Sequence, residues 1–131
     1  MSEILRQKAE SGDSRAQFAL GDMYSQGLGV EKSAEQAAVW YTKAAEQGHA
    51  QAQYMLAVMY SVGAGVAADA AEAFKWFCEA ASKGHAKAQF NLAVMYDQGY
   101  GAPKDPALAK EWYSKAADQG HEEAAERLKA L

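Results

Sequence analysis

The chain has 131 residues, of which 13 are Lys or Arg, 17 are Asp or Glu and one is a cysteine, Cys78. This length suits a single domain whose core needs no disulfide or metal ion, and one cysteine leaves no intramolecular disulfide framework. The net charge of −4 argues against a nucleic-acid-binding protein. No apolar run approaches the roughly 20 residues of a membrane span, so we expect no membrane insertion. Thirty alanines against two prolines favour an all-helical chain.

The N-terminal segment, residues 1–12, has charged residues from its third position and no apolar stretch typical of a signal peptide. We therefore expect a cytoplasmic protein, or a periplasmic or secreted one if a leader has been removed. The segment itself is predicted to form one helix, half of the unit that follows.

From residue 13 onward the sequence repeats with a period of 36 residues. Residues 48–83 and 84–119 align without gaps and are identical at 18 of 36 positions. The repeats are 13–48, 49–84 and 85–120, and a trailing half-unit covers 121–131. Together with 1–12, they make the chain one repeat domain. Three large apolar or aromatic residue types recur at this spacing: Trp40, Trp76 and Trp112, Tyr24, Tyr60 and Tyr96, and Leu20, Leu56 and Leu92.

Each repeat has the apolar spacing of two amphipathic helices. Between the two helices lies a Gly-x-Gly turn whose first glycine suits the left-handed end of the first helix. A capping residue then begins the second helix, namely Ser33, Asp69 or Asp105. Such pairs bury their apolar faces only against neighbouring pairs. We predict an all-α, right-handed α-solenoid of antiparallel helix pairs with about eight helices, and a core that includes the recurring Trp, Tyr, Leu and Met positions.

The stretch AxxWYxKAAEQGHAQAQYMLAVMYSVGAGV closely resembles Sel1-like repeats, which are related to tetratricopeptide repeats. The resemblance covers nearly the whole chain. It implies a bacterial adaptor or scaffold without enzymatic activity that binds other proteins. The chain lacks the paired cysteines of many secreted members of this family. A β-lactamase-like hydrolase, suggested for cysteine-rich relatives, is the less favoured alternative because no SxxK motif is present.

Residues that might carry chemistry have simpler interpretations. His49, His85 and His121 lie one per repeat, too far apart to converge on one metal ion, and follow helix-ending glycines as ordinary polar residues. The Gly-x-Gly turns lack the lysine and hydroxyl of a phosphate loop. Cys78 is expected to be an inert thiol. We expect no catalytic residue, metal or cofactor.

Binding is expected on the first helix of each repeat, which usually lines the concave groove of a helical solenoid. Phe18, Tyr54 and Phe90 lie off the main core stripe, where two interpretations stay open: an aromatic ladder for binding, or packing against the second helix of a neighbouring unit. Asn91 breaks the repeat, because Ala19 and Met55 occupy its position elsewhere. The candidate groove residues are Arg15, Phe18, Asp22, Gln51, Tyr54, Val58, Lys87, Phe90, Asn91, Val94 and Asp97. The expected partner is a peptide or helix of another protein. A monomer is favoured, and the alternative is a module that associates with itself end to end.

Overall fold

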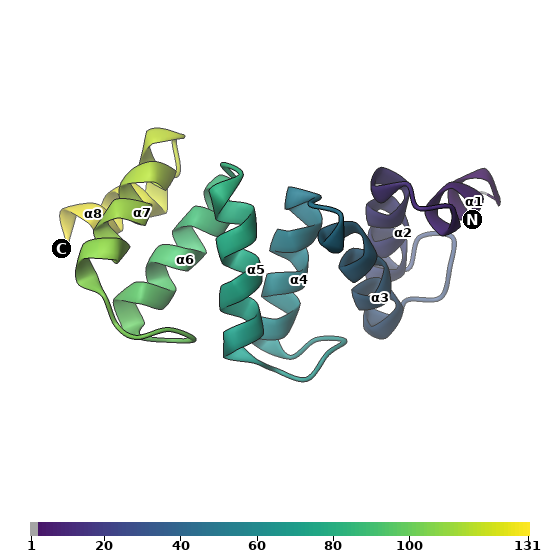
Figure 1. Cartoon of the computed structure of the whole chain (residues 1–131), viewed down its shortest axis with the longest axis horizontal. Helices are drawn as coiled ribbons and strands as arrows, with labels where there is room; N and C mark the ends of the chain where they lie inside the picture. Colours follow the sequence, from purple (N-terminus) through teal and green to yellow (C-terminus); the bar gives the residue numbers. More distant parts are fainter. Residues whose placement is uncertain (1–2) are drawn as a thin grey trace.

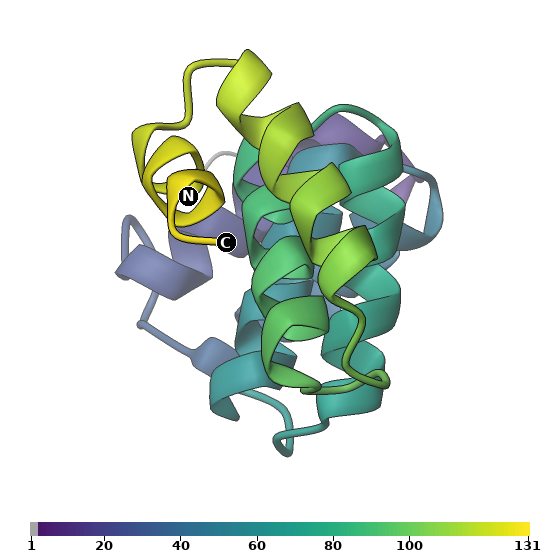
Figure 2. The same cartoon turned by 90° about the vertical axis from the view of Figure 1, so that its left-hand side faces the viewer.

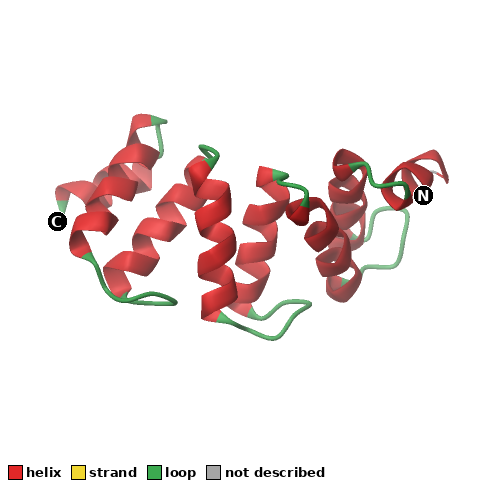
Figure 3. Cartoon of the chain, in the orientation of Figure 1, coloured by secondary structure: helices red, strands yellow, loops and turns green. Residues whose placement is uncertain are grey.

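A computed structural model describes residues 3–131, which form eight α-helices and no strand (Figures 1 and 3). The helices are α1 (Glu3–Glu10), α2 (Ser14–Gln26), α3 (Ala34–Glu46), α4 (Ala50–Val62), α5 (Ala70–Ser82), α6 (Ala86–Gln98), α7 (Pro106–Asp118) and α8 (Glu122–Lys129). Within the described range, no helix has both the length and the apolar character needed to cross a membrane.

The helices stand side by side in a row, with the two ends of the chain at opposite ends of it (Figure 1). Each helix packs mainly against the helices directly before and after it in the chain. Seen from the C-terminal end of the row, α8 lies beside α7 and the other helices lie behind them (Figure 2). The prediction of an α-solenoid built from helix pairs is confirmed: α2, α4 and α6 are the first helices of the repeats, and α3, α5 and α7 are the second.

The predicted turn between the two helices of each repeat is confirmed, with a glycine at the end of the first helix and a capping residue at the start of the second. Helix α2 ends at Gly27, which has a φ of 70°, and the equivalent glycines Gly63 and Gly99 adopt the same left-handed conformation. The second helices begin after Ser33, Asp69 and Asp105, whose side chains accept a hydrogen bond from the backbone N–H three residues later. These bonds satisfy backbone donors that an uncapped helix would leave unpaired.

The three histidines cap α4, α6 and α8, a role that the sequence analysis missed. Nδ1 of His49 accepts a hydrogen bond from the backbone N–H of Ala52 at 3.1 Å, and His85 and His121 do the same for α6 and α8. In the first repeat Asp13, a common capping residue, occupies the same position and caps α2. The capping role could have been predicted from the sequence, because the 36-residue alignment places each histidine at the position of Asp13.

The core consists mainly of alanines and of the residue that follows each tryptophan. Tyr41 and Tyr113 are among the largest fully buried side chains, together with the three recurring leucines. The predicted core positions are buried to different degrees. Trp40 and Trp76 are buried, whereas Trp112 is half-buried. The recurring tyrosines Tyr24, Tyr60 and Tyr96 are half-buried too, while Met59 and Met95 are buried and Met23 is not fully so.

One buried glutamine in each repeat connects three successive helices. Gln53 in α4 donates its amide hydrogen to the carbonyl of Ala45 in α3, at 3.1 Å, and accepts a hydrogen bond from the Lys83 ammonium that follows α5. Gln17 and Gln89 make the equivalent bonds, with Gln47 and Gln119 as their donors. A buried amide without partners would be costly, so this bonding favours one relative position of neighbouring repeats.

The second glycine of the turn, at Gly65 and Gly101, allows close approach of neighbouring repeats. A Cβ built on Gly101, where φ is 77°, would lie 2.6 Å from the carbonyl oxygen of Ala70 and 2.8 Å from Met95 Cε. Gly65 meets the carbonyl of Ala34 in the same way. These glycines are needed both for their backbone conformation and for the lack of a side chain.

Replacing Gly101 with Ala is expected to lower the free energy of unfolding by two separate amounts: about 1–2 kcal/mol for a left-handed alanine and about 1–3 kcal/mol for the steric overlap. Gly84→Ala is the matched control, because Gly84 has a φ of 90° and no atom within 4 Å of its built Cβ. Urea denaturation measures both variants. Equal losses would show that the close approach between repeats contributes nothing.

Stability is expected to fall as the pH is lowered below about 6.5, the usual histidine pKa. Burial lowers the pKa of His49 and of His85 in the folded protein, so the unfolded chain takes up protons first. The stabilisation is therefore complete above the unfolded pKa and is lost as the pH falls through the lowered folded pKa. A proton on Nδ1 also removes the cap, which is worth about 1 kcal/mol per helix.

The control for this prediction is the double variant His49→Asn/His85→Asn, because asparagine caps a helix without titrating in this range. Urea denaturation at pH 7.5 and pH 5 should show a smaller loss of stability for the double variant than for the unchanged protein. The same loss in both proteins would exclude the histidine caps as its source.

Candidate functional site

The three rings of the proposed aromatic ladder stack on the histidine caps of the next repeat. The ring of Phe18 lies 4.7 Å from that of His49, centroid to centroid, with an interplanar angle of 22°. Tyr54 stacks on His85 at 4.6 Å and Phe90 on His121 at 4.5 Å. One face of each ring is therefore covered by the protein itself.

Each of these rings also contacts the second helix of its own repeat. Phe18 meets Tyr41 at 5.6 Å between ring centroids, and the equivalent pairs are Tyr54 with Phe77 and Phe90 with Tyr113. The alternative considered from the sequence was packing against the second helix of a neighbouring unit, whereas the ring pairs found join each ring to the second helix of its own repeat. The rings are half-buried structural residues, and replacing all three with alanine would remove core packing as well as any binding contact.

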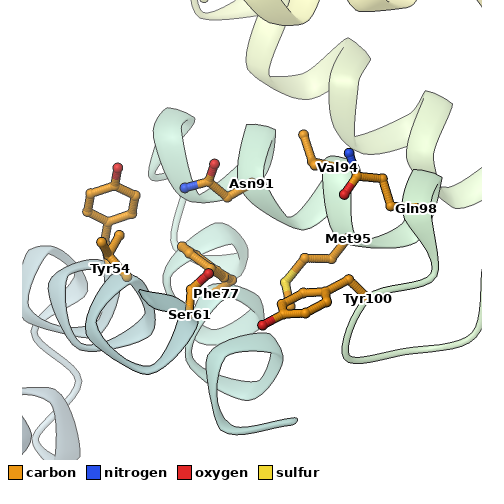
Figure 4. A pocket seen from close by; sticks show the side chains of 9 residues that line it. Tyr54, Ser61, Phe77, Asn91, Val94, Met95, Gln98 and Tyr100 are labelled. Carbon is orange, nitrogen blue, oxygen red and sulfur yellow. The ribbon is translucent and has the colours of Figure 1, made fainter. Parts of the chain in front are cut away.

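A hollow of about 490 Å³ opens between α4 and α6 (Figure 4). We call it the α4/α6 hollow, and its lining residues are Tyr54, Val58, Ser61, Phe77, Asn91, Val94, Met95, Gln98 and Tyr100. Tyr54 and Ser61 belong to α4 and Asn91, Val94 and Gln98 to α6, while Phe77 comes from α5 (Figure 4). A volume of this size is within the range of small-ligand sites, about 300–1,000 Å³.

Four of the candidate groove residues come together in this hollow: Tyr54, Val58, Asn91 and Val94. The other seven lie outside its lining. Asp22 and Asp97 accept hydrogen bonds from the hydroxyls of Tyr41 and Tyr113. Arg15, Gln51 and Lys87 are exposed in the first turns of their helices, where the Gln51 amide oxygen lies 2.8 Å from His85 Nε2. Phe18 and Phe90 belong to the two outer repeats.

The hollow lies where Asn91 interrupts the repeat. At the equivalent position in the second repeat, Met55 packs against the cluster that contains Tyr41. At the equivalent position after the third repeat, Arg127 lies over the Phe90 ring at 5.5 Å and donates a hydrogen bond to the Tyr113 hydroxyl. Asn91 has a shorter side chain than either residue. The longer side chains of Met55 and Arg127 occupy space at their own positions, whereas the equivalent space beside Asn91 is open.

The α4/α6 hollow is also the least polar of the three equivalent places. In the first repeat, the hydroxyl of Tyr41 donates to Asp22, and burial, followed by the Asp22 carboxylate, raises the pKa of that tyrosine so that it stays protonated. In the second repeat, Phe77 replaces the tyrosine and Val58 replaces the aspartate. None of the nine side chains that line the hollow carries a charge at neutral pH.

Five lining residues are not among the candidate groove residues, namely Ser61, Phe77, Met95, Gln98 and Tyr100. Phe77 is a buried core residue that also forms part of the hollow's wall. Tyr100 was overlooked, although it stands where Leu28 and Ala64 stand in the other repeats, and its side chain is exposed. A comparison of the three repeats position by position would have marked it beside Asn91.

The groups considered for chemistry show no catalytic arrangement. Burial, with a smaller contribution from Glu79, raises the pKa of Cys78 to about 11, so the group is a protonated thiol near neutral pH and a poor nucleophile. Among residues 3–131, no three His, Cys, Asp or Glu side chains lie together in a way that could hold a metal ion.

Comparisons with known proteins agree with the repeat period. The Sel1 repeat family matches residues 14–49, 50–85 and 86–121. No curated protein matches the chain. A Sel1 repeat protein from Oxalobacter formigenes is 44% identical, with a TM-score of 0.90 over 97% of this chain and 96% of its own.

Two further structures share the fold. One is c5321, a protective antigen of uropathogenic Escherichia coli, which is 44% identical with a TM-score of 0.92 over 95% of this chain. This chain spans only 27% of the length of c5321. The other is cysteine-rich protein B of Helicobacter pylori, which shares the fold at 20% identity, with a TM-score of 0.73 over 96% of both chains. Because three Sel1 repeats match the chain and its helices have this architecture, the chain belongs to the Sel1 repeat family.

Proposed function

We propose that this protein is an interaction scaffold that binds a peptide or helix of a partner along its first helices, α2, α4 and α6. Sel1 repeat proteins are generally protein-interaction scaffolds, and the chain belongs to this family. The observation that carries the assignment to this face is the α4/α6 hollow, which is formed by two neighbouring first helices and lined mainly by apolar side chains.

The two valines of the hollow are better suited to binding than the aromatic ladder is. Val58 and Val94 are half-buried and border the open volume, whereas Phe18, Tyr54 and Phe90 are already stacked on histidines. Apolar surface that stays partly exposed in the free protein gains the most from being covered by a partner. We therefore place the centre of the binding surface between α4 and α6.

A selection of random displayed peptides on the purified protein tests this proposal. Peptides that bind the unchanged protein are expected to bind Val58→Lys and Val94→Lys at least about tenfold more weakly, because a lysine ammonium would have to be desolvated beneath the peptide. Val39→Lys is the matched control. Val39 is 46% exposed on the second helix α3, so the same change in charge there should leave binding unaltered.

Thermal unfolding followed by circular dichroism establishes that all three variants are folded before binding is compared. Selected peptides that bind Val58→Lys and Val94→Lys as tightly as the unchanged protein would show that binding occurs elsewhere. If no peptide is selected, the scaffold assignment for this face is contradicted as well.

A further inference from the structure

We propose that the α4/α6 hollow is a socket for one large, uncharged apolar side chain of the partner, and that Asn91 keeps this socket open. This inference rests on the proposed function, because it specifies what a peptide on the first-helix face must present. The occupant we assign is an extended peptide segment that carries one anchoring side chain of leucine size or larger.

The chain itself shows which kinds of side chain suit such a place. Met55 supplies an apolar side chain at the equivalent position one repeat earlier. Arg127 supplies a cation at the equivalent position one repeat later, where it has the Phe90 ring and the Tyr113 hydroxyl as partners, and where Asp97 accepts a hydrogen bond from that same hydroxyl. At one neighbouring position an apolar side chain therefore packs beside the Tyr41 ring. At the other, a cation lies beside a ring and a hydroxyl that is itself bonded to a carboxylate.

The middle position has fewer polar and charged groups around it than either neighbouring position. Phe77 has no hydroxyl to accept a hydrogen bond from a cation, and Ser61 stands where Asp97 stands in the third repeat. Val58 likewise replaces the carboxylate of Asp22. A charged side chain entering this hollow would lose its hydration and find no opposite charge in the lining. The absence of charge therefore selects an uncharged anchor.

The remaining lining residues favour a large anchor over a small one. The aromatic rings of Tyr54 and Tyr100 lie on two sides of the hollow, with Phe77 between them and the thioether of Met95 nearby (Figure 4). Rings and thioethers make favourable contacts with apolar and aromatic side chains. The polar ends of Asn91, Ser61 and Gln98 supply hydrogen-bonding groups for the polar backbone on either side of the anchor.

The test is a variant, Asn91→Met, whose own side chain fills the socket. In Asn91→Met the new side chain should occupy the hollow as Met55 does at its own position, so the variant is expected to fold and to melt at or above the temperature of the unchanged protein. The peptides selected on the unchanged protein serve as probes, and binding is measured by fluorescence anisotropy. Asn91→Met should weaken binding at least about tenfold. Asn91→Ala is the control, because it removes the amide and leaves the hollow open.

Substitutions in the peptides complete the test. Each selected peptide should contain one large apolar residue whose replacement by aspartate weakens binding at least about tenfold on the unchanged protein. The same replacement should have little effect on Asn91→Met, because the socket is already filled.

The possible results separate this inference from the proposed function. If peptide binding is lost in Val58→Lys but unchanged in Asn91→Met, the proposed binding face is supported and the socket is overturned. Binding lost equally in Asn91→Met and Asn91→Ala would assign the effect to the amide and also overturn the socket. Peptides insensitive to both Val58→Lys and Val94→Lys would overturn the groove itself.

Discussion

The structure depends on the buried amide that joins each repeat to the one before it. A helix pair has too little apolar surface to fold alone, so the stability of a solenoid comes from the junctions between neighbours. Hydrophobic contact between alanine-rich helices is strong but allows sliding, because it has little directional preference. Gln53 prevents this sliding, because its hydrogen bonds to a carbonyl of the preceding repeat and to Lys83 of its own repeat require one relative position. The glycines at which neighbouring backbones nearly touch act in the same direction, since they leave no room for a shifted arrangement.

On this regular framework, the candidate site arises from departures from the repeat. Asn91 is shorter than its counterpart Met55, Phe77 lacks the hydroxyl of Tyr41, and Val58 lacks the charge of Asp22. Each change alone is small, and all three fall around one place between α4 and α6. Regular positions therefore account for the fold, and irregular positions account for the chemistry of the surface. Function in such a protein belongs to its sites and not to its fold.

The sequence was sufficient for the architecture because 36-residue periodicity, helical spacing and turn residues all indicate the same arrangement. The cap residues Ser33 and Asp69 could be named because capping is a local interaction. The role of the histidines was less visible, since histidine is an uncommon cap and its stacking partner lies about 30 residues away. The aromatic ladder was assigned to binding because periodicity shows only that Phe18, Tyr54 and Phe90 lie off the main stripe. Which neighbour covers a ring depends on packing in three dimensions, so the covered rings and the open hollow could not be told apart from spacing alone.

The walls of the α4/α6 hollow come from two different repeats, with Tyr54, Val58 and Phe77 on one side of the junction and Asn91, Val94 and Tyr100 on the other. Because both junctions between full repeats use an equivalent buried glutamine and an equivalent glycine contact, removal of one whole repeat would bring together residues that are now two units apart. Loss of residues 49–84, for example, would place Asn91 beside the repeat that contains Asp22 and Tyr41, and the space opened there would have a carboxylate at its base. Duplication or deletion of intact 36-residue units can thus exchange one surface chemistry for another without new point mutations, so such a gene can diversify its ligands by recombination while its product keeps folding.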